Sequence, residues 1–246
     1  MGVDKHILVI GDSCQDIFKY CDVRRLCPDL PVPILNEKKE VRNEGMAKNV
    51  QRNILSLGYS CNIVTNANWQ DITKTRFVHQ ESNHTFFRAD SNEAMPSINL
   101  ADVDYEHKMI VISDYDKGFL TKSDIETICG KHNNVFIDSK KVLGSWASGA
   151  RYIKINETEY KRSKETITSE IQEKIIQTRG AEGSLFRGIS YPVTKAEVKD
   201  VCGAGDSFLA ALVVKFLEEE NIEESIKYAN YCASQVVTRR GVSVIP

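Results

Sequence analysis

Short apolar runs recur along the chain, and a polar residue follows most of them. Apolar runs of this length are typical of strands buried on both faces, as in a parallel sheet. We therefore predict buried strands in the segments 6–10, 60–65, 108–113, 135–138, 151–155 and 175–178.

Helical spacing separates these runs. Apolar residues recur at helical intervals over 46–57, and Gly58 follows as a stop signal. Thr121 and Asp124 have the spacing of a capping box at the start of another helix. The segments 203–217 and 222–239 are the two clearest helices. Strands that alternate with helices predict a mainly parallel sheet covered on both faces.

The predicted strands lead to polar residues. Asp12, Asp114, Asp138, Asn156 and Thr178 each end or follow a strand. Because the carboxyl ends of parallel strands share one edge, we expect these side chains at one rim of the sheet, where ligands bind in such folds.

Two other stretches have a different character. The segment 20–43 contains three prolines and is predicted to be irregular, with a strand at 32–35. Segments 75–80 and 84–90 resemble two short strands joined by a Ser-Asn turn. No repeat or linker is visible, so we predict one domain over 1–246. The stretches of about 17–42 and 72–98 would form a small β appendage.

Composition narrows the class of protein. The 246 residues are 41% hydrophobic and 27% charged, with interleaved charges and a net charge of -2. This balance disfavours a nucleic-acid partner or an anionic membrane surface, although a local basic cluster could hold a small phosphorylated ligand. The seven cysteines form no paired motif, so we expect reduced thiols and a cytoplasmic location. The start has neither a signal-peptide core nor a myristoylation signal, and no apolar run is long enough to span a membrane.

The segment 200–208, DVCGAGDSF, carries the clearest chemistry. Gly203 and Gly205 allow a tight turn and a close approach by a ligand. The helix that follows directs amide groups and a positive dipole end to the same point, which suits an anion, and Asp206 lies in its first turn. A structural loop with a first-turn acid is the alternative interpretation. The string is neither a Walker loop nor a dinucleotide GxGxxG motif, because Phe208 stands at the third glycine position.

This string resembles the C-terminal signature of the PfkB/ribokinase family of carbohydrate kinases. Further segments follow in that family's order, and PVPIL, the 45–58 helix and SDYDKG resemble its heptose 7-phosphate kinase branch. The resemblance implies a ribokinase-like three-layer α/β sandwich with a mainly parallel sheet and a small β lid, here truncated at its periphery. The matching segments are GDSCQD (11–16), RLCPDLPVPIL (25–35), GMAKNVQRNILSLG (45–58), VISDYDKGFL (111–120), FIDSKK (136–141), INETEY (155–160) and TRGAEGSLF (178–186).

The resemblance also implies roles for individual residues. Asp206 would accept the proton of the attacking hydroxyl, and Gly203, Ala204 and Gly205 would stabilise the phosphoryl group in transfer. On the nucleotide side, Asn156 and Glu159 match a motif associated with Mg²⁺, and a strand end that enters a capped helix is the alternative interpretation. The residues matched to ATP are Thr178, Gly180, Gly183 and Asn230, of which Asn230 has a core-packing alternative.

The acceptor side is assigned in the same way. Asp12, Asp16 and Asn49 match groups that hydrogen-bond sugar hydroxyls, and a turn or cap is the competing role for Asp12. Gly45 and Asp114, which also lie in matched segments, are likewise assigned to substrate binding. A substrate phosphate would need cations, and each candidate has a solvated surface charge as its alternative. The candidates are Lys74, Arg76, Arg88 and Lys117.

The chain departs from the pattern at three points. Met46 stands where relatives have a second glycine, which would crowd the sugar pocket or shift the loop. Cys202 replaces the usual threonine. The chain is shorter than its relatives after Thr65 and between Tyr160 and Lys174. A trimmed sheet buries less area, so we expect modest stability or a homodimer.

The leading hypothesis is transfer of the ATP γ-phosphate to a heptose 7-phosphate or a related sugar, with Mg²⁺ and with assistance by a monovalent cation left open. One alternative is another PfkB-type sugar or nucleoside kinase with an unphosphorylated substrate. The other is a catalytically degenerate module that binds sugar or nucleotide.

Overall fold

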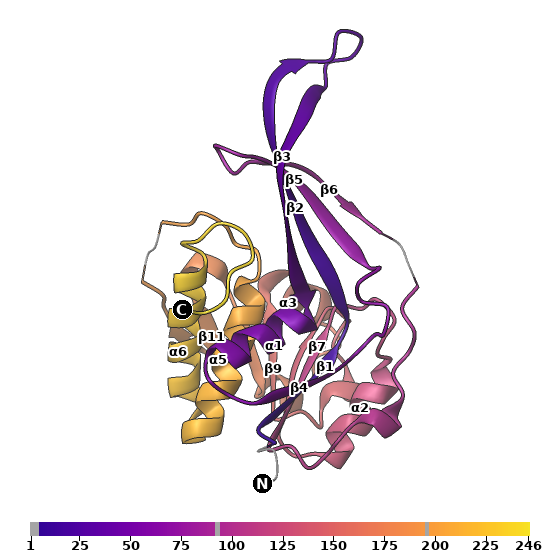
Figure 1. The fold of residues 1–246 in the computed structure, drawn as a ribbon. Helices are drawn as coiled ribbons and strands as arrows, with labels where there is room; N and C mark the ends of the chain where they lie inside the picture. Colours follow the sequence, from indigo (N-terminus) through magenta and orange to yellow (C-terminus); the bar gives the residue numbers. More distant parts are fainter. Residues whose placement is uncertain (1–4, 92–93, 195–196) are drawn as a thin grey trace.

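The computed structural model describes residues 5–91, 94–194 and 197–246. A layered α/β body carries a second sheet that projects from it (Figure 1). Residues 1–4, 92–93 and 195–196 of the predicted 1–246 domain lie outside the described residues, and 92–93 also belong to the predicted 72–98 stretch.

The main sheet has the strand order β12-β11-β10-β9-β8-β7-β1-β4 among the described residues. All the predicted buried strands are present in it and pair in parallel. Two short antiparallel strands at one edge were not predicted, because three residues show no periodicity. The bounds are β1 Ile7–Gly11, β4 Cys61–Thr65, β7 Met109–Asp114, β8 Val135–Ser139, β9 Tyr152–Asn156, β10 Ile175–Thr178, β11 Ser184–Phe186 and β12 Ile189–Tyr191.

Helices cover both faces of this sheet. Ile7 and Val9 of β1 pack in the same cluster as α1, α5 and α6, whereas Leu8 and Ile10 pack with α2 and α4. The strands are therefore buried on both faces, which explains why their sequences are continuously apolar. The bounds are α1 Ala47–Ser56, α2 Lys122–Lys131, α3 Glu157–Ser163, α4 Ser169–Gln172, α5 Ala204–Glu219 and α6 Ile222–Val236, with short 3₁₀ turns at Leu100–Asp102, Ser145–Ala147 and Gly180–Glu182.

The predicted helix signals are confirmed. Thr121 and Asp124 form a reciprocal capping box at the start of α2. Gly58 follows α1 with a φ of 87°, in the left-handed region that ends many helices. Within the described residues, every helix is too short or too polar to cross a membrane. All seven cysteines are free thiols, as their irregular spacing predicted.

The second sheet has the order β3-β2-β5-β6 and is called the lid below. The prediction that 20–43 is irregular was wrong, because β2 and β3 are paired strands of 14 residues each. Two of the three prolines lie in the connecting turn and Pro33 begins β3, so they interrupt neither strand. The outer parts of both strands are largely exposed, and their sequence therefore lacks an apolar period. The bounds are β2 Ser13–Leu26, β3 Pro33–Met46, β5 Thr73–His79 and β6 Thr85–Asp90.

Candidate active site

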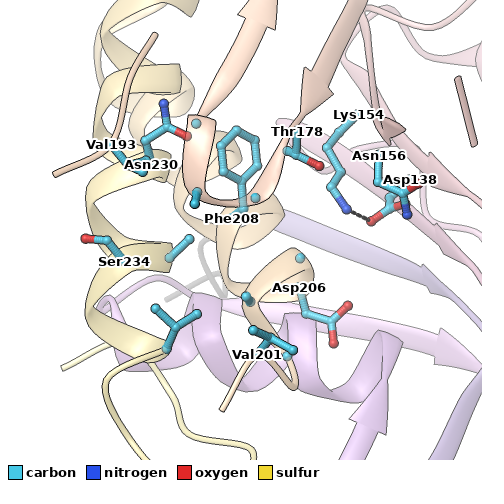
Figure 2. Close-up of a pocket in the computed structure, with 18 of the residues that line it drawn as sticks. Asp138, Lys154, Asn156, Thr178, Val193, Val201, Asp206, Phe208, Asn230 and Ser234 are labelled. Atoms are coloured by element: carbon cyan, nitrogen blue, oxygen red, sulfur yellow. Dashed lines mark hydrogen bonds and ion pairs between the residues drawn. The ribbon is translucent and has the colours of Figure 1, made fainter. Parts of the chain in front are cut away.

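A cavity of about 720 Å³ lies where the carboxyl ends of β8, β9 and β10 meet the start of α5. Figure 2 shows that its two ends differ in character. Asp206, Asp138 and Lys154 make one end polar, while Val193 lies at the other end, beside Asn230 of α6. The cavity therefore suits a ligand that has one charged end and one apolar end.

The first turn of α5 forms the polar floor of this cavity. Gly203 has a φ of 80°, and a Cβ atom there would lie 3.0 Å from Asn49 Nδ2. A Cβ atom on Gly205 would lie 3.1 Å from Lys154 Nζ. The two glycines thus allow an amide and an ammonium group to approach the helix start. The N–H of Ala204 donates to the carbonyl of Val201, so the first-turn amides left for an anion come after it.

Asp206 is buried at this point, and each of its carboxylate oxygens accepts one hydrogen bond. Asn49 Nδ2 donates to Oδ2 over 2.8 Å, and the Tyr115 hydroxyl donates to Oδ1 over 2.7 Å. Burial raises the pKa of Asp206 above its usual range, although both hydrogen bonds act in the opposite direction. A raised pKa makes this carboxylate a stronger base than an exposed aspartate.

Two lysine ammonium groups face the same end of the cavity. Lys154 Nζ donates to Asp138 Oδ2 over 2.6 Å, and Lys140 Nζ lies 3.8 Å from Asp138 Oδ1. Burial would raise the pKa of Asp138, but these two cations hold it below its usual range. Burial would lower the pKa of Lys140, but Asp138 and Glu159 raise it to about 12. The Lys140 ammonium group therefore stays charged at this end of the cavity.

Sequence reasoning gave Lys154, Lys140 and Tyr115 no role. A signal existed for Lys154, because it stands within an apolar strand that was predicted to be buried on both faces. A buried lysine needs a partner or a function. Tyr115 offered no comparable signal, because its contact with Asp206 joins residues 91 positions apart.

Asn156 and Glu159 form a capping box at the start of α3, as in the alternative interpretation of this motif. Both Glu159 oxygens are occupied, one by the Asn156 backbone N–H and the other by Lys140 and the Asn156 side chain. Asp138 Oδ1 is buried and has no hydrogen-bond partner. The oxygen best placed to face a cation is therefore that of Asp138.

The other residues matched to a nucleotide also line the cavity. The Asn230 amide is satisfied by the protein, because Oδ1 accepts from Ser184 and Nδ2 donates to the Tyr191 carbonyl. The packing alternative for this residue is thus present in the structure. Gly183 has a φ of 84°, and any Cβ there would overlap the Tyr191 carbonyl. The remaining matched residues on the cavity wall are Asn156, Thr178 and Gly180.

Two carboxylates expected at the substrate have other contacts. Asp12 is fully buried, and its oxygens accept the backbone N–H groups of Tyr115 over 2.5 Å and of Phe119 over 3.4 Å. Burial and the nearby charge of Asp114 raise the pKa of Asp12 to about 6. Asp114 is bound by Lys141 at 2.9 Å and 3.0 Å. Asp12 therefore holds the 115–119 loop, as in the turn or cap alternative for this residue, and Asp114 forms an ion pair with Lys141.

A smaller cavity of about 170 Å³ lies at the base of the lid. Lys74 and Lys117 line it together with Asp90 and Met46. Among the described residues, Arg88 lines neither cavity, and its half-exposed guanidinium pairs with Asp90.

Asp16 and Arg76 form an ion pair beside this smaller cavity. Arg76 Nη1 lies 2.5 Å from Asp16 Oδ1, and both side chains are largely buried. Gly45 packs so closely against the Asp16 carboxylate that any Cβ would overlap it. This contact explains the glycine at position 45. It also leaves Asp16 with one oxygen outside the ion pair.

Met46 has a backbone conformation that normally requires glycine. Its φ of 61° and ψ of -131° lie outside the regions favoured by residues with a Cβ. The side chain is buried and lines the smaller cavity. The loop has therefore kept a glycine-type conformation, and the methionine side chain crowds the cavity.

We expect Met46→Gly to be more stable than Met46→Ala by about 1 kcal/mol, because glycine relieves the backbone strain. Chemical denaturation of both variants measures this difference. The matched control is Gln51→Gly against Gln51→Ala within α1, where alanine should be the more stable. If the glycine variant were the more stable of the two at both positions, or the alanine variant at both, the proposed strain at Met46 would be contradicted.

Solved structures identify the fold of this protein. Ribokinase from Thermotoga maritima aligns with a TM-score of 0.76 at 18% identity, covering 98% of this chain and 96% of that one. Arabidopsis thaliana ribokinase, solved with ribose and ATP, aligns with a TM-score of 0.73 at 17% identity, covering 99% and 95%. The fold is therefore ribokinase-like, as predicted.

The family follows from the sequence. The pfkB family carbohydrate kinase profile matches residues 47–246, so the chain belongs to this family and is a phosphotransferase with an alcohol acceptor. Curated relatives include the bifunctional protein HldE of Helicobacter acinonychis, 30% identical over 299 positions, and that of Nitratiruptor, 28% identical over 290. Each alignment covers 96% of this chain, which spans 64% and 62% of those relatives. About 236 residues of this chain, 96% of 246, are aligned over 290 and 299 positions. The alignments therefore contain long gaps in this chain, in agreement with the predicted truncation.

Proposed function

We propose that the protein transfers the γ-phosphate of ATP to a hydroxyl of a heptose 7-phosphate or a related sugar phosphate, with Asp206 as the general base. The observation that supports this most is the buried Asp206 carboxylate at the start of α5, beside the cavity's two lysines. The resemblance to the heptose 7-phosphate kinase branch and the HldE relatives support the sugar.

The larger cavity would hold ATP. Its apolar end, with Val193 and Val237, suits an adenine ring, and its polar end suits the phosphates. Among the described residues, no cluster of three or more His, Cys, Asp or Glu could hold a metal alone. Mg²⁺ keeps several waters and uses phosphate oxygens, so Asp138, with Glu159 acting through water, fits its needs. The ion would neutralise phosphate charge.

The reaction requires one proton acceptor and a stabilised phosphoryl group. The sugar hydroxyl would lose its proton to Asp206 as its oxygen forms a bond to the γ-phosphorus and the bond to the ADP oxygen breaks. The first-turn amides of α5 and the Lys154 and Lys140 ammonium groups would stabilise the negative charge of the transferring group. The products are ADP and a sugar bisphosphate.

Asp206→Asn should lower turnover by about 10³-fold, because an amide cannot accept the hydroxyl proton. ATP binding, measured by calorimetry, should stay close to that of the parent. Asp71→Asn changes an exposed aspartate and serves as the control. Equal ADP production by Asp206→Asn and the parent would refute the assignment of the base.

The smaller cavity would hold the phosphate of the acceptor through Lys74 and Lys117. Alanine at either position should lower kcat/KM for a sugar phosphate by about tenfold or more, because a charge-assisted contact is lost. The value for the matching free sugar should hardly change. Lys122→Ala on α2 is the control. Equal losses with both acceptors would favour the alternative of an unphosphorylated substrate.

We also propose that the lid forms a homodimer contact, because Leu26, Leu30, Val32 and Phe87 expose apolar side chains on it. The unfolding temperature of the parent should then rise with protein concentration. Leu26→Glu with Leu30→Glu should remove that dependence. A parent melt that does not change with concentration would count against the dimer.

A further inference from the structure

Tyr115 stands between the two cavities. Its hydroxyl donates to Asp206 Oδ1 over 2.7 Å. Lys74 Nζ lies 4.8 Å from the centre of its ring, and Lys140 Nζ lies 5.4 Å from it. Lys74 lines the smaller cavity and Lys140 the larger one. The ring is therefore in contact with one cation from each cavity.

The loop that carries Tyr115 is fixed by buried acids. Asp12 accepts the backbone N–H of Tyr115, and Asp114 accepts that of Asp116 over 3.1 Å. Lys141 binds Asp114 and also lies 2.8 Å from Asp116 Oδ1. These contacts determine where the tyrosine hydroxyl points. They also give Asp12 and Asp114 a structural role that requires no contact with substrate.

The hydroxyl stays a hydrogen-bond donor under working conditions. Burial and the negative charge of Asp206 raise the pKa of Tyr115 well above its usual range, so the phenol keeps its proton. A carboxylate oxygen can accept two hydrogen bonds, so Asp206 Oδ1 can still receive an acceptor hydroxyl. Asn49 occupies Oδ2 from the other side.

We propose that Tyr115 is a positioning residue for the proton transfer: its hydroxyl orients Asp206 Oδ1 toward the acceptor and favours the ionised carboxylate. This inference rests on the proposed function of Asp206. Loss of the hydroxyl would leave the carboxylate free to turn about its side-chain bond. It would also remove one of only two donors that stabilise the negative charge of Asp206 among the described contacts.

Tyr115→Phe isolates the hydroxyl, because the ring and its two lysine contacts remain. A hydrogen bond to the ionised form lowers a carboxylate pKa, so its loss should raise the pKa of Asp206. The acidic limb of the kcat/KM profile should then move to higher pH by about one unit. At neutral pH, kcat should fall by about tenfold, while the KM for ATP should hardly change.

Tyr59→Phe is the matched control. It also removes a tyrosine hydroxyl that donates to a carboxylate, Glu218 Oε1 at 2.6 Å, but it lies just before β4, away from the rim that carries Asp206. Its pH profile should match that of the parent. If the acidic limb of the kcat/KM profile lies at the same pH in Tyr115→Phe as in the parent, the inference is overturned.

A second measurement needs no acceptor. The side-chain carboxyl carbon of Asp206, identified by ¹³C NMR through its absence in Asp206→Asn, should titrate at higher pH in Tyr115→Phe than in the parent. An unchanged titration overturns the inference even if turnover is lost. Absence of acceptor-dependent turnover in the parent instead overturns the proposed function, and with it the use of Tyr115 in the reaction.

Discussion

The site depends on keeping one buried carboxylate, Asp206, charged at the start of a helix. Burial removes water from this group, which would favour its neutral form. Asn49 and Tyr115 each donate one hydrogen bond in compensation, and the positive end of the α5 dipole lies at the same point. These donors come from α1 and from the loop after β7, far from Asp206 in the sequence. The proposed base is therefore assembled only when the sheet and α5 have packed.

A second buried carboxylate nearby has the opposite environment. Asp138 faces two ammonium groups, whereas the two hydrogen-bond donors to Asp206 are neutral. The pKa of Asp138 is accordingly lowered and that of Asp206 raised. Two aspartates at one rim thus differ in basicity through their neighbours alone. The more basic one suits proton transfer, and the less basic one suits a cation.

The sequence predicted the body of the fold well, because strands buried on both faces and amphipathic helices leave periodic signals. It failed for β2 and β3, whose outer parts face solvent and so show no apolar period. For the site, the ends of the predicted strands correctly indicated the rim of the sheet. The residue types alone could not show which group each aspartate binds. Asp12 was matched to a group that binds sugar hydroxyls, with a turn or cap as its competing role, and in the structure its carboxylate accepts two backbone N–H groups. An aspartate suits either partner, so only the packed structure distinguishes them.

The two halves of the site come from different parts of the molecule. The body supplies Asp206, Asp138 and Lys154, and the lid supplies Lys74 and the Asp16–Arg76 pair. The strained Met46 lies where the lid strand β3 meets α1, and it lines the smaller cavity proposed for the acceptor. Substitutions at position 46 would alter the smaller cavity and leave the start of α5 unchanged. The choice of acceptor can therefore vary in this fold without loss of the groups proposed for phosphoryl transfer. Lys74 of the lid contacts the ring of Tyr115, and this contact connects the lid to those groups.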